Sequence, residues 1–200
     1  MEKHQEQYFQ QVADAIRHDD IEFFRKAFLA LHPYDQAQFV LTQEADVRTR
    51  LYTYLSPREM AGIFENLELE QQERFISEME SSYVADMLSS MYVDDAVDVL
   101  NQLGTEKIAS FLAIMDDEAA KEIKKLLHYE EKTAGSIMTT EFVAVDANRT
   151  VREAMRDLRK EAPSAETIYY IYIIDEYKKL VGVISLRDLI IADGEDKISD

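Results

Sequence analysis

Residues 133–189 read TAGSIMTTEFVAVDANRTVREAMRDLRKEAPSAETIYYIYIIDEYKKLVGVISLRDL, and this stretch decides the fold of the second part of the chain. Thr150, followed three residues later by Glu153, is a capping box that marks the start of a helix. Apolar, β-branched and aromatic runs on either side of that helix predict strands. The expected elements are a strand over 142–146, a helix from Thr150, a strand over 168–175, a charged turn over 176–179, a strand over 180–185 and a helix over 186–192.

Composition narrows the class of protein. Two hundred residues allow one or two domains, and 46% hydrophobic residues are enough to bury a core. The absence of cysteine excludes disulfides and thiol chemistry. No apolar run reaches the roughly 18–20 residues that span a bilayer, and no signal peptide precedes Tyr8. We therefore expect this chain to be soluble and cytoplasmic.

The net charge of −18 is spread unevenly. Residues 1–130 hold 26 acidic and 12 basic side chains, and residues 131–200 hold 14 and 10. Half of the excess lies over 56–98, which has 11 acidic and 2 basic residues. Phosphates require Lys and Arg, so this balance argues against nucleic acid and against an anionic membrane surface. Such an excess of carboxylates suits a hard cation, and it is equally compatible with a merely acidic surface.

The front half of the chain is a repeat with a period of twelve residues. Twelve is not a multiple of 3.6, so one continuous helix would rotate its apolar stripe by about 120° per repeat. The pattern therefore predicts short helices of about ten residues, stacked into a superhelix. The recurring apolar positions are Leu55, Leu67, Met79, Met91, Leu103, Met115 and Leu127.

Start signals separate these helices. Ser56 precedes Pro57 and forms a capping box with Glu59, and Gly104 sits where a helix stop is expected. The other predicted starts are Ser81, Asp94, Thr105 and Asp116. Upstream, amphipathic patterns predict helices over 7–17, 21–31 and 34–43.

The order of elements after Thr133, with SIMT at its entrance and GVISLRD at its exit, resembles a CBS motif, a regulatory module that works in pairs. Helical repeats followed by YEEKTAGSIMTTEFVAV and ETIYYIYIIDEYKKLVGVISLRDLIIAD resemble the cytosolic part of the MgtE family of magnesium transporters over essentially the whole chain. The fold expected is an α superhelix over 1–130, followed by an α/β half of a CBS pair over 131–200.

This resemblance implies a function and partners. It implies a longer polypeptide with a second CBS motif, a connecting helix and a transmembrane magnesium pore, at the cytoplasmic face of the cell membrane. The region would then sense cytosolic Mg²⁺, and Mg²⁺ bound between the N and CBS domains would favour the closed state. Strands over 168–174 and 181–184 are apolar enough to be buried on both faces. Half a CBS pair would leave them uncovered, so we expect either a homodimer or a disordered C-terminal segment.

The resemblance also assigns metal ligands to Asp94, Asp95 and Asp98 in the segment VDDAVD. Asp94 and Asp98 lie four residues apart, on one face of a helix, and a cation would relieve the repulsion between them. Mg²⁺ keeps several waters, so one or two carboxylates from each domain suffice. The alternative is that Asp94 caps a helix and its neighbours are solvated. A further family acidic position is occupied here by Gly62, flanked by Glu59 and Glu65.

Many CBS pairs bind adenine nucleotides, which makes GVISLRD a second candidate site. Ser185 and Asp188 would hold ribose hydroxyls, and Tyr170 and the edge at 167–168 would flank the base. The alternative is that Asp188 pairs with Arg187 or caps the last helix. Binding normally needs two motifs, so we expect little or none in this chain.

The sequence shows no catalytic pattern. The histidines, His4, His18, His32 and His128, share no metal-ligand spacing, and no phosphate loop or nucleophile elbow occurs. We expect a protein that is not an enzyme. Besides a magnesium sensor, two functions stay open: a CBS-based adenine-nucleotide sensor and a helical protein-interaction scaffold. In each case a hinge is expected over 128–135, between the two domains.

Overall fold

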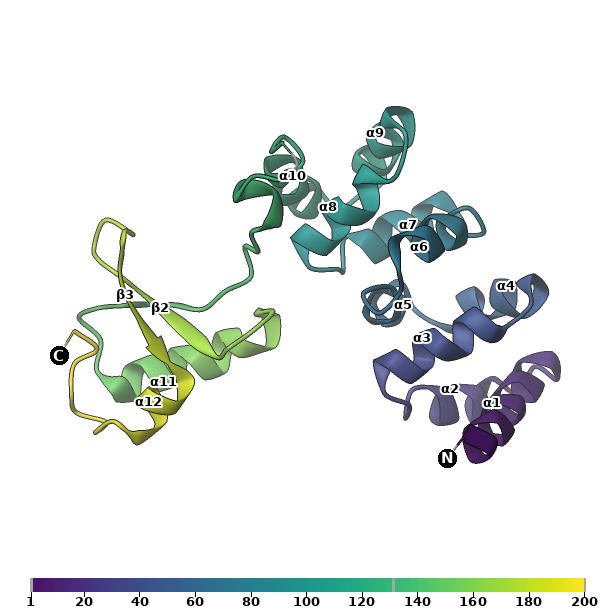
Figure 1. The fold of residues 1–200 in the computed structure, drawn as a ribbon, viewed down its shortest axis with the longest axis horizontal. Helices are drawn as coiled ribbons and strands as arrows, with labels where there is room; N and C mark the ends of the chain where they lie inside the picture. The colour runs from purple at the N-terminus through teal and green to yellow at the C-terminus, as the bar shows by residue number, and fades with distance from the viewer. Residues whose placement is uncertain (1, 131, 200) are drawn as a thin grey trace. The chain divides into compact units, whose positions relative to one another are not determined.

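The computed structural model describes residues 2–130 and 132–199, which form two compact units, Met1–Ser136 and Ile137–Asp200 (Figure 1). The first unit is helical, and the second combines a small sheet with helices. Within these described ranges, no helix has both the length and the apolar character needed to cross a bilayer.

The helical unit is a run of short helices with a strict period. Its described helices are α1 (Glu2–Arg17), α2 (Ile21–Phe28), α3 (Pro33–Thr42), α4 (Ala45–Tyr54), α5 (Pro57–Phe64), α6 (Leu69–Ile76), α7 (Ser81–Leu88), α8 (Val93–Asn101), α9 (Thr105–Ile114) and α10 (Asp117–Leu126). From Ile21 onward, every helix begins twelve residues after the previous one. The predicted repeat is confirmed, and it extends upstream to α2. The sequence pattern named no helix where α4 lies.

From α5 onward, each helix packs against the next but one, whereas α1 packs against α2 and α4. Contacts join α3 to α5, α5 to α7 and α7 to α9, and likewise α6 to α8 and α8 to α10. Each of α5, α7 and α8 has one buried stripe of four side chains, which in α5 are Met60, Ala61, Ile63 and Phe64. Burial of a side chain such as Phe64 contributes about 2–3 kcal/mol, so packing rather than helix propensity stabilises these short helices.

The helix starts follow the repeat more than the local capping signals. The capping box at Ser56 is confirmed, and Asp116 caps α10. Asp94 is not a cap, because Tyr92 is the N-cap of α8. Gly104 does not end a helix but is the N-cap of α9, with φ −68°. Ser81 and Thr105 are likewise the first residues inside their helices rather than caps. The spacing of the apolar residues determines where each helix begins. The N-cap is then whichever residue lies at that position of the repeat.

The second unit has the predicted order of elements. A 3₁₀ turn (Gly135–Ile137) leads into it, followed by β1 (Ala144–Asp146), α11 (Val151–Glu161), a second 3₁₀ turn (Ala162–Ser164), β2 (Tyr170–Ile174), β3 (Leu180–Ser185) and α12 (Leu186–Ile191). The sheet order is β1-β2-β3, with β1 parallel and β3 antiparallel to β2. The Thr150 capping box begins α11 as predicted, through a 3.3 Å hydrogen bond from the Glu153 N–H to Thr150 Oγ1.

One face of this sheet is covered and the other is open. Ile171 and Ile173 point into a core that α11 and α12 complete with Leu158 and Leu189. On the opposite face, Tyr170, Tyr172 and Val183 are exposed, which agrees with the prediction that half a CBS pair leaves apolar strand surface uncovered. The last described residues fold back onto α11, where Asp196 O accepts the Val151 N–H at 2.9 Å.

Candidate functional site

The first candidate site is the start of α8. The helix turns Ala96, Val97, Val99 and Leu100 inward, which leaves Asp94 and Asp95 half-buried in the first turn and Asp98 exposed one turn later. The partial positive charge of the helix N-terminus stabilises carboxylates in the first turn. Asp98 lies beyond that turn and gains less from it.

The pKa of Asp98 is shifted in the opposite direction from the pKa values of Glu59 and Glu78. Its side chain is exposed on one edge, yet partial burial raises the pKa of the Asp98 carboxyl. The Arg25 guanidinium lowers the pKa of Glu59, and Arg48 lowers the pKa of Glu78. A raised pKa means that the ionised carboxylate of Asp98 is disfavoured, and a bound cation would offset that cost.

The donor set at α8 fits Mg²⁺ in its chemistry. Carboxylate oxygens are the hard ligands that Mg²⁺ takes, and the ion usually keeps several waters beside one or two carboxylates. In the part of the chain that the structure describes, no three His, Asp or Glu side chains stand together as a metal cage. Asp94, Asp95 and Asp98 are therefore not such a cage on their own, and their assignment as metal ligands stays a prediction.

The Gly62 position has a clear structural setting. A β-carbon built on Gly62 would meet no atom within 4 Å. Of the acidic residues beside it, Glu59 is held by Arg25 in a two-pronged ion pair, with N–O distances of 2.6 and 3.1 Å. Glu59 therefore has its charge already matched, which makes it a poor metal ligand.

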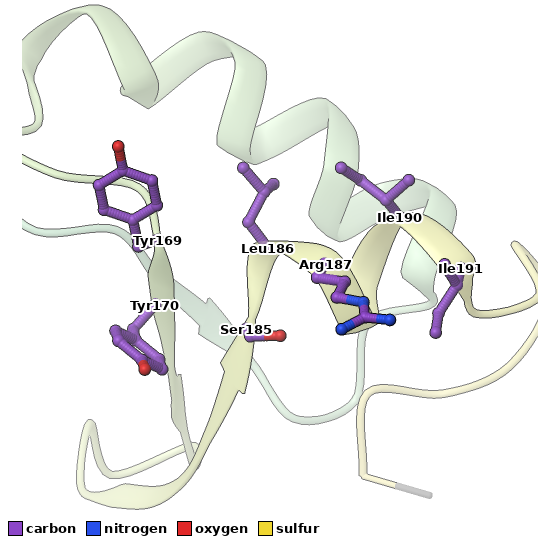
Figure 2. Close-up of a pocket in the computed structure, with 7 residues that line it drawn as sticks. All are labelled: Tyr169, Tyr170, Ser185, Leu186, Arg187, Ile190 and Ile191. Atoms are coloured by element: carbon purple, nitrogen blue, oxygen red, sulfur yellow. The ribbon is translucent and has the colours of Figure 1, made fainter.

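The second candidate site is a groove of about 660 Å³ beside β2, β3 and α12 (Figure 2). Tyr170 and Ser185 are paired across the two strands, so one predicted base-flanking residue and one predicted ribose-binding residue lie on one groove wall. The other predicted residues, Thr167, Ile168 and Asp188, are not part of the lining. The lining is mostly apolar, with one guanidinium. The lining residues are Tyr169, Tyr170, Ser185, Leu186, Arg187, Ile190 and Ile191.

Asp188 stands apart from this lining. Ser185 Oγ donates a 2.7 Å hydrogen bond to Asp188 Oδ2 and accepts the Asp188 N–H at 3.1 Å. Ser185, rather than Asp188, is therefore the N-cap of α12, and Asp188 lies in the first turn of that helix. The sequence analysis did not predict Arg187 as a groove residue. Its position in the motif, between Ser185 and Asp188, is the signal that could have identified it.

Comparison with family models matches both parts of the chain. Residues 31–132 match the MgtE intracellular N domain, and residues 134–195 match the CBS domain. Among curated proteins, the magnesium transporter MgtE of Enterococcus faecalis is 48% identical over 197 residues. That of Thermus thermophilus is 33% identical over 190 residues. The chain spans 44% and 42% of the lengths of these two relatives, which is less than half of each.

Two solved structures share the fold. One is the soluble part of a magnesium transporter, with a TM-score of 0.92, 48% identity, and coverage of 98% of this chain and 77% of the other. The second is the cytosolic domain of the Mg²⁺ channel MgtE in complex with ATP. Its TM-score is 0.84, its identity is 33%, and the match covers 96% of this chain and 78% of the other.

Proposed function

This chain belongs to the MgtE family, and on that premise we propose that it is the cytosolic Mg²⁺-sensing region of a magnesium transporter. The observation that carries the proposal is the group of carboxylates at the start of α8, where burial raises the pKa of Asp98. The relatives named as magnesium transporters, and the matching soluble part of one, support the same assignment.

In this proposal, the acidic residues of the helical unit make the arrangement of the two units depend on Mg²⁺. Residues 56–98 have a net charge of −9, and the second unit is also acidic. Two unit charges about 5 Å apart repel by about 3 kcal/mol at an effective dielectric constant of about 20. At low Mg²⁺, a few such pairs would outweigh a modest contact and keep the two units apart.

Mg²⁺ acts by differential affinity. If Asp94, Asp95 and Asp98 share the ion with acidic groups of the CBS side, the arrangement with both faces together binds it better. Binding then shifts the population toward that arrangement. Closing of the pore by cytosolic Mg²⁺ is therefore feedback inhibition of transport by the transported ion.

This proposal includes partners. The open face of the sheet around Tyr170, Tyr172 and Val183 is an apolar surface that a second CBS motif would cover. The pore domain and a second copy of the chain complete the assembly, which sits at the cytoplasmic face of the cell membrane.

The metal site can be tested in this chain with Mn²⁺, a paramagnetic substitute for Mg²⁺. We expect Mn²⁺ to broaden the amide NMR signals around Asp94 and Asp98 first, and excess Mg²⁺ to restore them. Asp94→Asn and Asp98→Asn should each weaken this effect. Asp86→Asn is the matched control, because it neutralises an exposed carboxylate at the same repeat position one helix earlier. Uniform broadening over all acidic helices, unchanged in the Asp94 and Asp98 variants, would refute the site.

A second candidate function is the binding of an adenine nucleotide in the groove. The observation in its favour is the joint lining by Tyr170, Ser185 and Arg187, together with the solved relative in complex with ATP. Arg187 supplies a positive charge for a phosphate, and the exposed Tyr170 ring offers a stacking surface. We expect millimolar ATP to shift the NMR signals of these residues, and Arg187→Ala to reduce the shifts. ATP-induced shifts that avoid the groove would exclude this function.

A further inference from the structure

The chain that leads from the helical unit toward the sheet is folded rather than extended. After α10 ends, the Tyr129 N–H donates to Leu126 O at 3.1 Å, and the His128 ring stacks on the Tyr129 ring with centroids 4.6 Å apart. Thr133 Oγ1 donates to Glu130 O at 2.7 Å, and the Ser136 N–H donates to Thr133 O at 3.2 Å. These bonds turn the chain back so that Gly135 returns to Tyr129.

Gly135 lies directly on the Tyr129 ring. A β-carbon at position 135 would stand 2.5 Å from Cγ and 2.7 Å from Cε1 of Tyr129, far inside the contact distance of carbon atoms. The φ angle of Gly135 is not positive, so this close approach, rather than a left-handed backbone, is what requires glycine. Gly62 and Gly104 differ in this respect, because a β-carbon on either would meet nothing within 4 Å.

The division between the two units falls after this contact. The first compact unit ends at Ser136, so the Tyr129–Gly135 contact belongs to the helical unit. Ile137 is 80% exposed. On the other side, Glu141 O accepts the Glu166 N–H at 2.9 Å, which attaches Glu141 to the second unit. Thr139 and Thr140 in turn hydrogen-bond to Glu141, so the stretch without such attachment is residues 137–138.

We propose that the stacking of Tyr129 on Gly135 is a latch that fixes where the second unit leaves the helical unit. Tyr129 and Gly135 are positioning residues, because they act through the connection and touch no ligand. The latch confines the hinge to residues 137–138, whereas the sequence pattern places it over 128–135. When the latch is broken, the connection lengthens toward the end of α10.

The length of the connection sets how readily the two units meet. The effective concentration of two tethered surfaces falls as roughly the −3/2 power of the tether length. Lengthening the tether therefore lowers that concentration. This consequence rests on the proposed function. If one Mg²⁺ closes the two units, the Mg²⁺ concentration at half closure should rise by about the same factor.

Distance measurements can test the latch without Mg²⁺. The chain has no cysteine, so Ser82→Cys and Tyr177→Cys, both at exposed positions, take spin labels at two defined points. Pulsed electron paramagnetic resonance then gives the distribution of distances between the units. Gly135→Ala forces the ring away, and Tyr129→Ala removes it. We expect both variants to broaden the distribution, and the double variant to broaden it no further than either single one.

Gly104→Ala is the matched control, since it makes the same substitution at a glycine with open space around it. Circular dichroism should show equal helix content in all variants. If Gly135→Ala and Tyr129→Ala keep the wild-type width, the latch is refuted, whatever the response to Mg²⁺. If the wild type fails to close with Mg²⁺, the proposed function is wrong, and the Mg²⁺-free widths still decide the latch.

Discussion

A buried ion pair between α4 and the end of α6 offers the sharpest test of the helical packing. The Arg48 side chain is 2% exposed, and it bonds both carboxylate oxygens of Glu78 at 2.9 and 2.5 Å. It also donates to Gln43 O, and its guanidinium lies 4.9 Å from the Phe75 ring centroid. Tyr52 Oη donates to Glu78 Oε2 at 2.9 Å. The pair therefore joins residues thirty positions apart in the sequence.

Removal of the carboxylate should be the more damaging change. Glu78→Ala leaves a buried guanidinium with one carbonyl and one ring, and loss of one partner of a buried pair costs about 3–5 kcal/mol. Glu78 is 19% exposed, so water can reach the site, and we expect the lower end, about 3 kcal/mol. Arg48→Met leaves Glu78 with Tyr52, the exposed Arg74 at 3.9 Å and water, at a cost of about 1–2 kcal/mol. The double variant Arg48→Met/Glu78→Leu should recover most of the loss, because apolar residues can replace such a pair.

Urea unfolding at pH 7, followed by far-ultraviolet circular dichroism, measures these differences. Arg50→Ala is the control, since Arg50 is exposed, its ion pair with Asp19 is 3.4 Å long, and such pairs contribute about 0–1 kcal/mol. A free energy of unfolding for Glu78→Ala within about 0.5 kcal/mol of the wild type would refute the reasoning. A larger loss for Arg48→Met than for Glu78→Ala would also refute it.

Three further predictions concern protonation and the open sheet face. Because Arg48 lowers the pKa of Glu78 in the folded state, its contribution to stability is complete above the ordinary pKa of about 4.5. This contribution is lost as the pH falls below that value. The free energy of unfolding of Glu78→Gln should therefore depend less on pH between pH 3 and 7 than that of the wild type. Because burial raises the pKa of Asp98, protons should compete with Mg²⁺ at pH values above the ordinary Asp range, and Asp98→Asn should remove this competition in a calorimetric titration. On the sheet, Ile171→Ala should cost about 3 kcal/mol of stability, whereas Val183→Lys should cost under about 0.5 kcal/mol and weaken any self-association seen by light scattering.

Local signals predicted the parts of the fold that depend on neighbours in sequence. In the capping boxes at Ser56 and Thr150, both hydrogen bonds join residues three positions apart, so the local sequence is enough to predict them. The twelve-residue period identified the superhelix because it records which side chains face the core. The prediction that Gly104 ends a helix is wrong because glycine is favourable at either end of a helix. Only its position in the twelve-residue repeat shows that it precedes α9.

The sequence alone did not predict features that depend on contacts between residues far apart in the chain. Arg48 is a charged residue in an unpredicted helix, and its burial depends on Glu78, thirty residues away. The uncovered face of β2 and β3 was expected from the single CBS motif, but the sequence does not show which partner covers it, because its residues are as apolar as those of any buried strand. The contact of Gly135 with Tyr129 likewise depends on a turn of the backbone that composition does not reveal.

The most direct test of magnesium sensing is the flux of Mg²⁺ through the intact transporter as a function of Mg²⁺ on its cytosolic side. With Asp94→Asn or Asp98→Asn, inhibition should require a clearly higher Mg²⁺ concentration than in the wild type. Asp86→Asn should leave that concentration unchanged. If both α8 variants are inhibited at the wild-type concentration, these carboxylates are a solvated helix face, and the sensor lies elsewhere.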